Sequence, residues 1–533
     1  MQPKMKSRTR LKAEALRRRK KRSDGAASFI KTIMIYLLTV SMLAFAGIYI
    51  NGRQGAARAQ SEPEIPPEKM HVFKFGGALR AQINENHIAP VQITITADNN
   101  SFTAIYRDVI LDVCDSFKGA ALGLFGGASV CARLDAEEGG KLWRECAEAV
   151  NSVYIRYAGE YLYSVIHTFL DKTRDGGNGM YERDAYYGEL AMVHELFIVD
   201  KNPVFGVARD RNGNIAVFIP EETAAQSVKT FINAAYLKSA AENTAGIMQC
   251  EFLKGGDIGY NIKNLKFPDS FHIYDNYNVF TSELAFTNPL LDENNAINTN
   301  QDCINDLFGL LNFNVESSIT YHSPESGALV FEDGKNAVNF YERGLIVYDG
   351  RPFGADVRGG AGGVHLSKFL AGYGDADNYT FYEKIKAASV FVSGVASELT
   401  GNEGKLRLKS ITSDRGGALA FAFSYYYEGI KIKIGKSDDG VEVLIDGDRI
   451  VRVKINAMNI SSQNMNMIKN RNPIWGLGVI DAMISSDRGA AERYKLAYDA
   501  ADGKFIVNAF ELVYDIDYAG GGVVAAAAAW EIK

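Results

Sequence analysis

An uncharged apolar stretch near the N-terminus, Thr32–Ile50 (TIMIYLLTVSMLAFAGIYI), constrains this chain more than any other feature. Its 19 residues would form a helix of about 28 Å, close to the hydrocarbon thickness of a bilayer. Residues 1–31 contain 12 Lys and Arg against two acidic residues, whereas between Ile50 and Glu68 the only basic residues are Arg53 and Arg58. Because basic flanks stay in the cytoplasm, the pattern predicts a cytoplasmic tail, one membrane span and a large extracytoplasmic portion.

Two other interpretations of Thr32–Ile50 remain open at this stage. Ala57-Arg58-Ala59 has the small-residue pattern of a signal-peptidase site, but it lies beyond Ile50 and the stretch exceeds the usual h-region of about 7–15 residues. A buried helix of a soluble core would leave the asymmetry of flanking charge unexplained. An uncleaved signal-anchor in the cell membrane, with the C-terminal domains outside the cytosol, is therefore our prediction.

The length of 533 residues exceeds what one hydrophobic core supports, since such cores stop growing near about 250–300 residues. We expect about three folded regions. The predicted organisation is a basic cytoplasmic tail (1–31), a transmembrane helix (32–50), a linker (51–69), an N-terminal extracytoplasmic α+β domain (70–255), a connection (256–295), a middle helix-plus-sheet module (296–375) and a C-terminal helix-plus-sheet module (376–533).

Charge separates the tail from the rest of the chain. The tail carries a net charge of +10, whereas the remaining residues carry 46 basic and 62 acidic side chains. The basic tail suits an anionic inner leaflet. The acidic remainder has no footprint for counterion release, which argues against nucleic acid as a partner.

The N-terminal domain shows mixed periodicity. Asn212-Gly213 lies between two alternating apolar runs and predicts a type I′ hairpin over 204–219. The other expected elements are strands at 91–96 and 152–157 and helices at 102–117, 141–150, 162–170 and 222–239. The polar residues at 276–300 predict a long connection.

The C-terminal half repeats one pattern, a helix followed by short strands. Ile304, Leu307, Phe308 and Leu311 form the apolar face of the first helix, and the second helix has the stripe Phe381, Ile385, Ala388, Val392, Val395 and Leu399. The expected strands are 317–322, 328–332, 337–341 and 345–349 after the first helix, and 406–412, 419–427, 430–434, 441–445 and 450–455 after the second. A helix laid on an antiparallel meander is an α+β module, so the predicted fold class is α+β with two such modules in tandem.

The motifs of known chemistry are incomplete. His194-Glu195 begins an HExxH pattern, but Ile198 stands where the second His is needed. Asp210, Asn212, Asn214 and Glu221 fit calcium-loop positions 1, 3, 5 and 12, but Ile215 replaces the required Gly, and the hairpin explains the same residues better. We therefore predict no catalytic residues, no metal site and no cofactor, and a protein that is not an enzyme.

Five cysteines, Cys114, Cys131, Cys146, Cys250 and Cys303, are widely spaced and form no CxxC pair. One disulfide among the first three is possible by spacing, and buried free thiols are the alternative that we favour.

Tyr425, Tyr426 and Tyr427 end an apolar strand and form a candidate protein-contact edge. The competing interpretation is a strand buried on both faces.

The C-terminal half resembles the YycH/YycI family, membrane-anchored extracytoplasmic regulators of the WalK (YycG) sensor histidine kinase of Gram-positive bacteria. The resemblance rests on INDLFGLLNFN (304–314), on a strand containing Tyr321, on ALVFEDGKNAVNFYERGLIVYDG (328–350), on ALAFAFSYYYEGIKIKI (418–434) and on the closing YKLAYDAADGKFIVNAFELVYDI and AWEI segments. It covers about 285–533 well and 70–255 only in general layout, and it transfers no catalytic residue.

The resemblance implies a regulator that biases a sensor histidine kinase of a cell-wall two-component system through transmembrane and outer-domain contacts. The membrane, the kinase and a companion regulator of the same family are the implied partners. Thr39 and Gly47, eight positions apart in the span, form a candidate helix-contact face, because small and hydroxyl residues allow close helix approach. A structural or assembly protein of the envelope is the alternative, followed by a wall- or peptide-directed hydrolase.

Overall fold

The computed structural model describes residues 85–97, 100–104, 129–170, 192–219, 230, 247–252, 263–266, 272–274, 279–291, 297, 302–350, 362–370, 379–401, 405–413, 417–435, 439–470, 473–487, 496–507, 510–516, 524–526 and 528–532. The chain divides into two units, Met1–Lys74 and Phe75–Lys533, and every described residue lies in the second unit. The predicted tail, span and linker lie outside the described residues.

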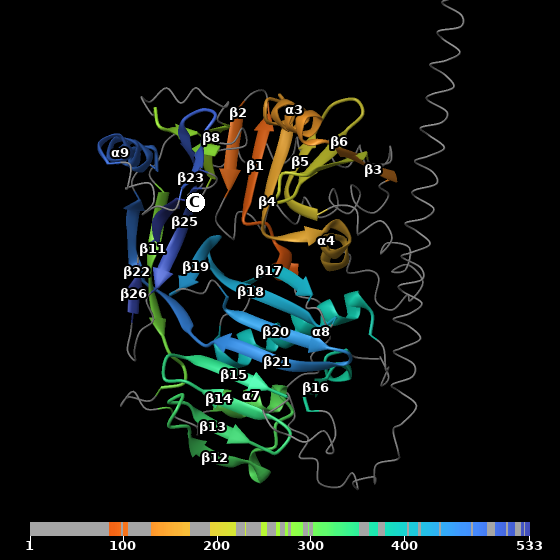
Figure 1. Cartoon of the computed structure of the whole chain (residues 1–533), viewed down its shortest axis with the longest axis vertical. Helices are drawn as coiled ribbons and strands as arrows, with labels where there is room; N and C mark the ends of the chain where they lie inside the picture. The colour runs from red at the N-terminus through yellow and green to blue at the C-terminus, as the bar shows by residue number, and fades with distance from the viewer. Residues whose placement is uncertain are drawn as a thin grey trace, which may run out of the picture. The chain divides into compact units, whose positions relative to one another are not determined.

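Strands dominate the described part of the chain (Figure 1). The helices are η2 (Glu85–Ile88), α3 (Ala136–Ala147), α4 (Tyr163–Leu170), α7 (Asp302–Leu310), η3 (Val315–Ser317), η4 (Leu366–Lys368), α8 (Phe381–Gly394), η5 (Val395–Leu399) and α9 (Pro473–Ser486). The N-terminal strands are β1 (Gln92–Ala97), β2 (Asn100–Ala104), β3 (Ser129–Leu134), β4 (Ser152–Leu162), β5 (Met192–Val199), β6 (Phe205–Arg209), β7 (Ile215–Ile219), β8 (Ile247–Phe252), β9 (Leu265–Lys266), β10 (His272–Tyr274) and β11 (Val279–Thr287).

The second half supplies the other strands. They are β12 (Ile319–His322), β13 (Leu329–Glu332), β14 (Ala337–Phe340), β15 (Leu345–Asp349), β16 (Val364–His365), β17 (Leu406–Ser413), β18 (Leu419–Tyr427), β19 (Ile430–Ile434), β20 (Val441–Asp446), β21 (Arg449–Asn456), β22 (Asn459–Asn470), β23 (Ala497–Asp499), β24 (Lys504–Ile506), β25 (Phe510–Ile516), β26 (Val524–Ala526) and β27 (Ala528–Ile532). The fold is mixed α+β, as predicted.

The N-terminal residues build a nine-stranded sheet in the order β10-β8-β2-β1-β4-β5-β6-β7-β3. Helix α3 packs against it and begins at Asp135, whose carboxylate accepts the backbone N–H groups of Glu137 and Glu138. The Trp143 ring of α3 lies edge-on to Phe197 of β5, with 4.7 Å between the ring centroids. This aromatic contact holds the helix on the sheet.

The predicted hairpin is present as β6 and β7, which pair antiparallel from Gly206↔Phe218 to Arg209↔Ile215. Its turn is longer than the predicted type I′ turn, because within 210–214 only Gly213 has a positive φ (86°) and type I′ needs two such residues. Asp210 Oδ1 accepts the N–H groups of Asn212 and Asn214 at 2.9 and 2.7 Å. The hairpin is confirmed, and its turn type is corrected.

A second, twelve-stranded sheet contains both predicted modules. Its main path is β12-β13-β14-β15-β21-β20-β18-β19-β25-β27, with β16 paired to β21 and β17 to β18. Strand β15 of the middle module pairs with β21 of the C-terminal module from Leu345↔Asn456 to Asp349↔Arg452. The two predicted helix-plus-sheet units therefore share one continuous sheet.

Helices α7 and α8 both pack into the core of this sheet. The Phe308 ring of α7 lies 5.2 Å from Phe331 and 5.9 Å from Phe340. At the end of α8, a Cβ on Gly394 would lie 2.9 Å from a methyl carbon of Leu310. Because Gly394 has no side chain, α7 and α8 can approach closely.

The first turn of α8 follows directly from its sequence. Thr380 and Glu383 form a capping box, in which each side chain accepts the other residue's backbone N–H. Most of the predicted stripe of α8 and η5 is buried, namely Ile385, Ala388, Val392, Val395 and Leu399. The helix prediction for this region is confirmed.

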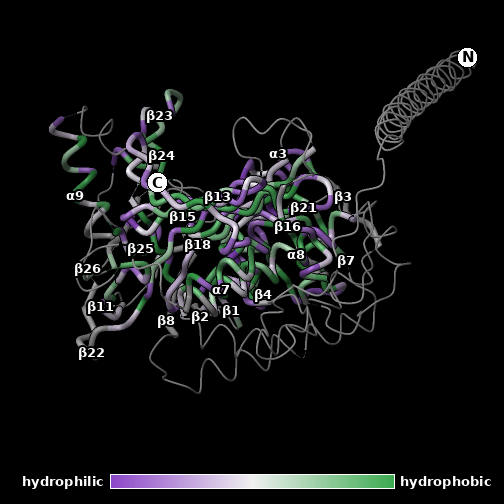
Figure 2. The backbone as a smooth tube through the Cα atoms, turned by 90° about the horizontal axis from the view of Figure 1, so that it is seen from below, coloured by the Kyte–Doolittle hydropathy of each residue, from purple (hydrophilic) through white to green (hydrophobic). Residues whose placement is uncertain are grey.

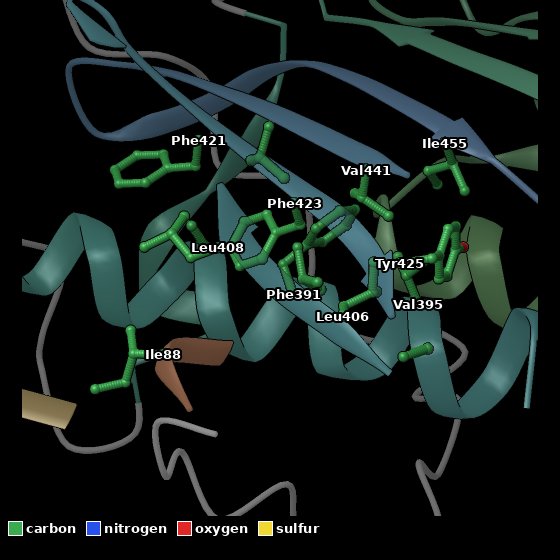
Figure 3. Packing of buried hydrophobic residues seen from close by; sticks show 14 of the residues in the cluster. Ile88, Phe391, Val395, Leu406, Leu408, Phe421, Phe423, Tyr425, Val441 and Ile455 are labelled. Carbon is green, nitrogen blue, oxygen red and sulfur yellow. The ribbon is translucent and has the colours of Figure 1, made fainter. Parts of the chain in front are cut away.

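The two large sheets, with the helices that pack on them, contact each other through polar groups as well as apolar ones. His87 Nδ1 lies 2.9 Å from Ser389 Oγ of α8. The Tyr161 hydroxyl of β4 donates to the Leu408 carbonyl of β17. Arg156 of β4 forms an ion pair of 2.8 Å with Glu511 of β25. Apolar side chains from both regions also join one buried cluster, which includes Ile88 of η2, Leu408 of β17 and Phe421 of β18 (Figure 3).

Two other sequence predictions are wrong, and a third concerns residues that lie almost entirely outside the described ranges. Asn100–Ala104 is a strand, although the sequence predicted a helix from residue 102. Val279–Thr287 is a strand within the predicted polar connection, and its Leu284 and Phe286 are fully buried. Helix 222–239 falls almost entirely outside the described residues, with Thr230 the exception.

Candidate interaction surfaces

An exposed strand ends the twelve-stranded sheet. All four residues of β12 are exposed, and in the described structure β12 pairs only with β13. Ile319 is 69% and Tyr321 45% exposed, and Val315, just before the strand, is 40% exposed. We call β12 together with Val315 the edge-strand surface. The alternating residues 317–322 predict the strand but not its place at the end of the sheet.

The two faces of β12 differ because of its register with β13. Ile319 lies opposite Glu332 and Tyr321 opposite Val330, whereas Thr320 lies opposite Phe331. Phe331 is buried against α7. Since opposite residues in an antiparallel pair share a face, Ile319 and Tyr321 point to the face away from α7.

A turn between β12 and β13 fixes which backbone groups are free. The Ser323 N–H donates to the Ala328 carbonyl at 2.8 Å, and the Gly327 N–H donates to the Ser323 carbonyl at 2.9 Å. Hydrogen-bonded and non-hydrogen-bonded pairs alternate along an antiparallel ladder. Ile319 and Tyr321 therefore bond to β13, and the N–H and C=O groups of Thr320 and His322 point to the open edge.

Helix α9 exposes a second apolar surface. Leu477, Ile480 and Ile484 are buried, whereas Val479 is 50% and Met483 44% exposed. Together with exposed Gly476, these last two define the α9 surface. Its residues recur at helical spacing, so they lie along one side of the helix. Figures 1 and 2 place α9 at the periphery of the described unit.

A polar contact fixes which side of α9 faces outward. Asp481, 7% exposed, accepts the backbone N–H of Asn264 at 2.6 Å. The Asn264 side-chain amide donates to Ser485 Oγ at 2.7 Å. The one charged residue of the helix is thus satisfied on its inner side, which leaves the α9 surface uncharged.

The tyrosines proposed as a contact edge do not form one. Tyr425 is fully buried and Tyr426 is 8% exposed, and Tyr427 is half-buried. Their strand, β18, has paired neighbours on both sides, β17 and β20, and a further pairing with β19. Figure 3 shows Tyr425 beside Leu406 and Val395. The structure agrees with the alternative interpretation, a strand buried on both faces.

His194 and Glu195 occupy neighbouring positions of β5, so their side chains leave opposite faces of the sheet. The His194 ring bonds to the Gly159 carbonyl through Nδ1 at 3.0 Å, and burial lowers its pKa. Glu195 accepts from the Tyr154 hydroxyl at 2.5 Å and lies 3.6 Å from Arg209 Nε. Each side chain supports the sheet structure, and the two do not converge.

A hydroxyl, an imidazole and a carboxylate that sequence analysis missed meet at Ser367, His365 and Asp448. His365 Nδ1 lies 2.7 Å from Ser367 Oγ, and Nε2 lies 2.9 Å from Asp448 Oδ2. The Ser367 N–H also donates to Nδ1, because His365 caps the short helix η4. These contacts fasten β16 and η4 to the turn at Asp448. Nothing local in the sequence links residues 365 and 448.

Cys146 of α3 is a free thiol that is 1% exposed. Burial raises its pKa to about 12, so the thiol stays protonated. Among the described side chains, no three His, Cys, Asp or Glu residues gather as a metal ion requires.

The predicted membrane span, Thr32–Ile50, lies outside the described residues. Thr39 and Gly47, the candidate helix-contact face, lie outside them. Within the described ranges, no helix has both the length and the hydropathy of a membrane span. The span at Thr32–Ile50 therefore stays a prediction.

Comparisons with known proteins gave one structural likeness. No protein-family model and no curated protein matches the chain. The crystal structure of YycH from Bacillus subtilis matches with a TM-score of 0.44 and 10% sequence identity, over 85% of this chain and 95% of that chain. A likeness at this level leaves the family of the chain unassigned.

Proposed function

We propose that this chain is a membrane-anchored extracytoplasmic regulator of a sensor histidine kinase in a two-component system that controls cell-wall metabolism. It acts without catalysis, through contacts of its transmembrane helix and its outer domains. The sequence resemblance over about 285–533 and the charge asymmetry around Thr32–Ile50 support the proposal. A companion regulator of the same family is a further partner in this scheme.

The observation that carries the proposal is the uncharged α9 surface. Val479 and Met483 are large apolar side chains that remain about half exposed on a helix whose opposite side is already packed. Protein contact sites are depleted of charge at their centre and enriched in Met and aromatic residues. An outer domain with such a surface can bind a sensor domain beside it.

Regulation requires that the chain bind one signalling state of the kinase more tightly than the other. A coupling free energy of about 1–3 kcal/mol shifts such an equilibrium about 5- to 150-fold. In this scheme the span and the α9 surface each supply part of the difference. Thr39 and Gly47 are the residues of the span that we assign to helix contact.

The test places a photocrosslinking amino acid at Met483 in the full chain and, separately, at Arg53 beside the span. We expect both positions to crosslink in native membranes to the same sensor histidine kinase. The double variant Val479→Glu with Met483→Glu places two carboxylates on the α9 surface. Binding of the kinase there would bury these charges without partners, which is costly. We therefore expect the variant to lose the crosslink from Arg53 or to regulate the kinase less. Val150→Glu is the matched control, since Val150 is 49% exposed elsewhere on the unit.

Two results contradict the proposal. Crosslinks only to division or wall-synthesis proteins, with no kinase among them, would favour the envelope-assembly alternative. The second is unchanged kinase output in both variants, the one with Thr32–Ile50 replaced by an unrelated span and the one with the double Glu substitution. That result would show that neither the span nor the α9 surface contacts the kinase as proposed.

A further inference from the structure

We propose that β12 receives an extended, basic segment of a partner protein as an added strand. The inference concerns the edge-strand surface and depends neither on the α9 surface nor on the identity of a kinase. Its basis is the open backbone of Thr320 and His322, the apolar pair Ile319 and Tyr321, and the acidic residues around them.

The backbone of β12 is ready for pairing. The turn at Ser323 and Ala328 sets the ladder so that Ile319 and Tyr321 bond to β13. The N–H and C=O groups of Thr320 and His322 then face outward, at exposed residues. An extended segment laid along this side gains main-chain hydrogen bonds without any rearrangement of the sheet.

The strand lacks the features that usually protect an edge. Natural edge strands carry Lys, other charged residues, Pro or a bulge, which block pairing with another chain. The residues of β12, Ile-Thr-Tyr-His, include none of these, and the β12–β13 register from Ile319↔Glu332 to His322↔Leu329 contains no shift. The nearest proline, Pro324, lies beyond the strand. The length of four residues limits the added strand to a short segment.

The side chains of β12 determine which partner segment can pair with its open edge. Ile319 and Tyr321 point to the face away from α7 and are exposed. On a strand added beside β12, alternate residues would lie next to this pair on the same face. Apolar residues at alternate positions of the partner would therefore bury Ile319 and Tyr321.

The acidic residues around β12 favour a basic partner segment over a second copy of this chain. Glu316 and Glu325 are exposed on either side of β12, and Glu332 lies opposite Ile319. In the described structure none of these three carboxylates forms a salt bridge. Two copies of this edge would bring like charges together, so a second copy of the chain fits poorly. A segment with Lys or Arg between its apolar residues fits well.

The experiment uses the purified full chain in mild detergent and a nine-residue peptide, KVKVTVKVK, with blocked ends. Amide hydrogen exchange is read in the segment 317–323, and binding is followed by the anisotropy of labelled peptide. We expect the peptide to slow exchange at the outward amides of Thr320 and His322. The acidic peptide EVEVTVEVE should give no protection of this segment.

Thr320→Pro and Thr320→Val separate strand addition from side-chain contact. Proline removes an outward N–H and is tolerated on the solvent side of an edge strand, whereas Val keeps the N–H and the shape. We expect Thr320→Pro to weaken binding about tenfold or more, because main-chain bonds are lost, and Thr320→Val to bind as the parent does. Glu316→Gln with Glu325→Gln should weaken binding and flatten its dependence on salt.

Several outcomes overturn the proposal. They are no protection of 317–323 by the basic peptide, equal binding by a Thr320→Pro chain whose thermal unfolding matches the parent, and equal protection by the acidic peptide. Dimerisation of the chain through β12, seen as concentration-dependent protection without peptide, would assign the edge to a second copy instead. None of these results bears on the crosslinks expected from Met483 and Arg53.

Discussion

Strands β12 and β18 belong to the same sheet and both carry tyrosine, yet only one of them is open to a partner. Tyr321 of β12 is 45% exposed, whereas Tyr425 of β18 is fully buried. By composition, β18 (LAFAFSYYY) looked the better contact edge than β12 (ITYH). The difference shows that a strand's place in the sheet order, and not its aromatic content, decides whether its edge and side chains are exposed.

The physical reason lies in the neighbours of each strand. Strand β18 has β17 on one side and β20 on the other, while β12 stands at the end of the path and pairs only with β13 in the described structure. Tyr425 also places its hydroxyl 3.2 Å from the Asn456 carbonyl, so even its polar atom is satisfied inside the protein. Substitutions in and around these two strands test this contrast between a central and an edge strand.

The largest effect should come from Tyr425→Ala. The substitution removes a fully buried ring from among Leu406, Val441 and Ile455 and leaves a cavity. We expect a loss of about 3–5 kcal/mol in the free energy of unfolding, as for other buried aromatic residues. Urea unfolding followed by circular dichroism measures it, and a loss below about 1 kcal/mol would show that β18 is not central to the core.

Gly440→Ala tests the packing around the same tyrosine. A Cβ at residue 440 would lie 2.5 Å from Cδ2 of Tyr425 and 3.2 Å from Leu406 Cδ2. Overpacking of this kind typically costs about 1–3 kcal/mol. As a control, Gly476→Ala places a Cβ where no atom lies within 4 Å, and in a helix it should stabilise by about 0.5–1 kcal/mol. Thermal unfolding of both variants shows whether they move in opposite directions.

Acid should weaken the core beside β18 through His87. Its ring lies 5.0 Å from the Phe423 ring, and burial, aided by the Arg407 charge, lowers its pKa from 6.5 to about 3. Below pH 6.5 the unfolded chain therefore binds a proton that the folded chain does not, and stability falls with falling pH. This group alone should lower the free energy of unfolding by about 1.4 kcal/mol between pH 7.5 and 5.5.

His87→Gln isolates that contribution, because glutamine keeps a polar group near Ser389 but does not titrate. The measurement is urea unfolding of parent and variant at pH 7.5 and 5.5. We expect the variant to lose less stability than the parent over this interval. Equal losses in the two proteins would mean that His87 takes up its proton in the folded state.

Much of the second sheet could be predicted from local patterns. The stripe of α8 and its Thr380–Glu383 capping box are encoded within one segment, and strands β13 to β15 follow alternation and turn glycines. Strand β22 (NISSQNMNMIKN) was missed, because its polar residues resemble a loop. It owes its structure to pairing with the distant strand β11.

The interaction surfaces depend on contacts that no local pattern reports. The pairing of Leu345 with Asn456 joins the two modules and leaves β12, not β18, at the end. Likewise, the outward side of α9 is set by the bond between Asn264 and Asp481, residues 217 positions apart. The sequence therefore predicts that β12 and β18 are strands and which side chains they carry. Their order in the sheet and the orientation of α9 depend on contacts between distant residues.

The smallest effect on stability should come from Tyr321→Ala, the edge counterpart of Tyr425→Ala. Tyr321 is 45% exposed and its hydroxyl lies 3.5 Å from Glu332, so its removal should change the free energy of unfolding by no more than about 0.5 kcal/mol. The same variant should weaken binding of the basic peptide to β12, since it removes half of the exposed apolar pair. A loss of stability as large as that of Tyr425→Ala would mean that Tyr321 is covered in the folded chain, and the contrast between edge and centre would not hold.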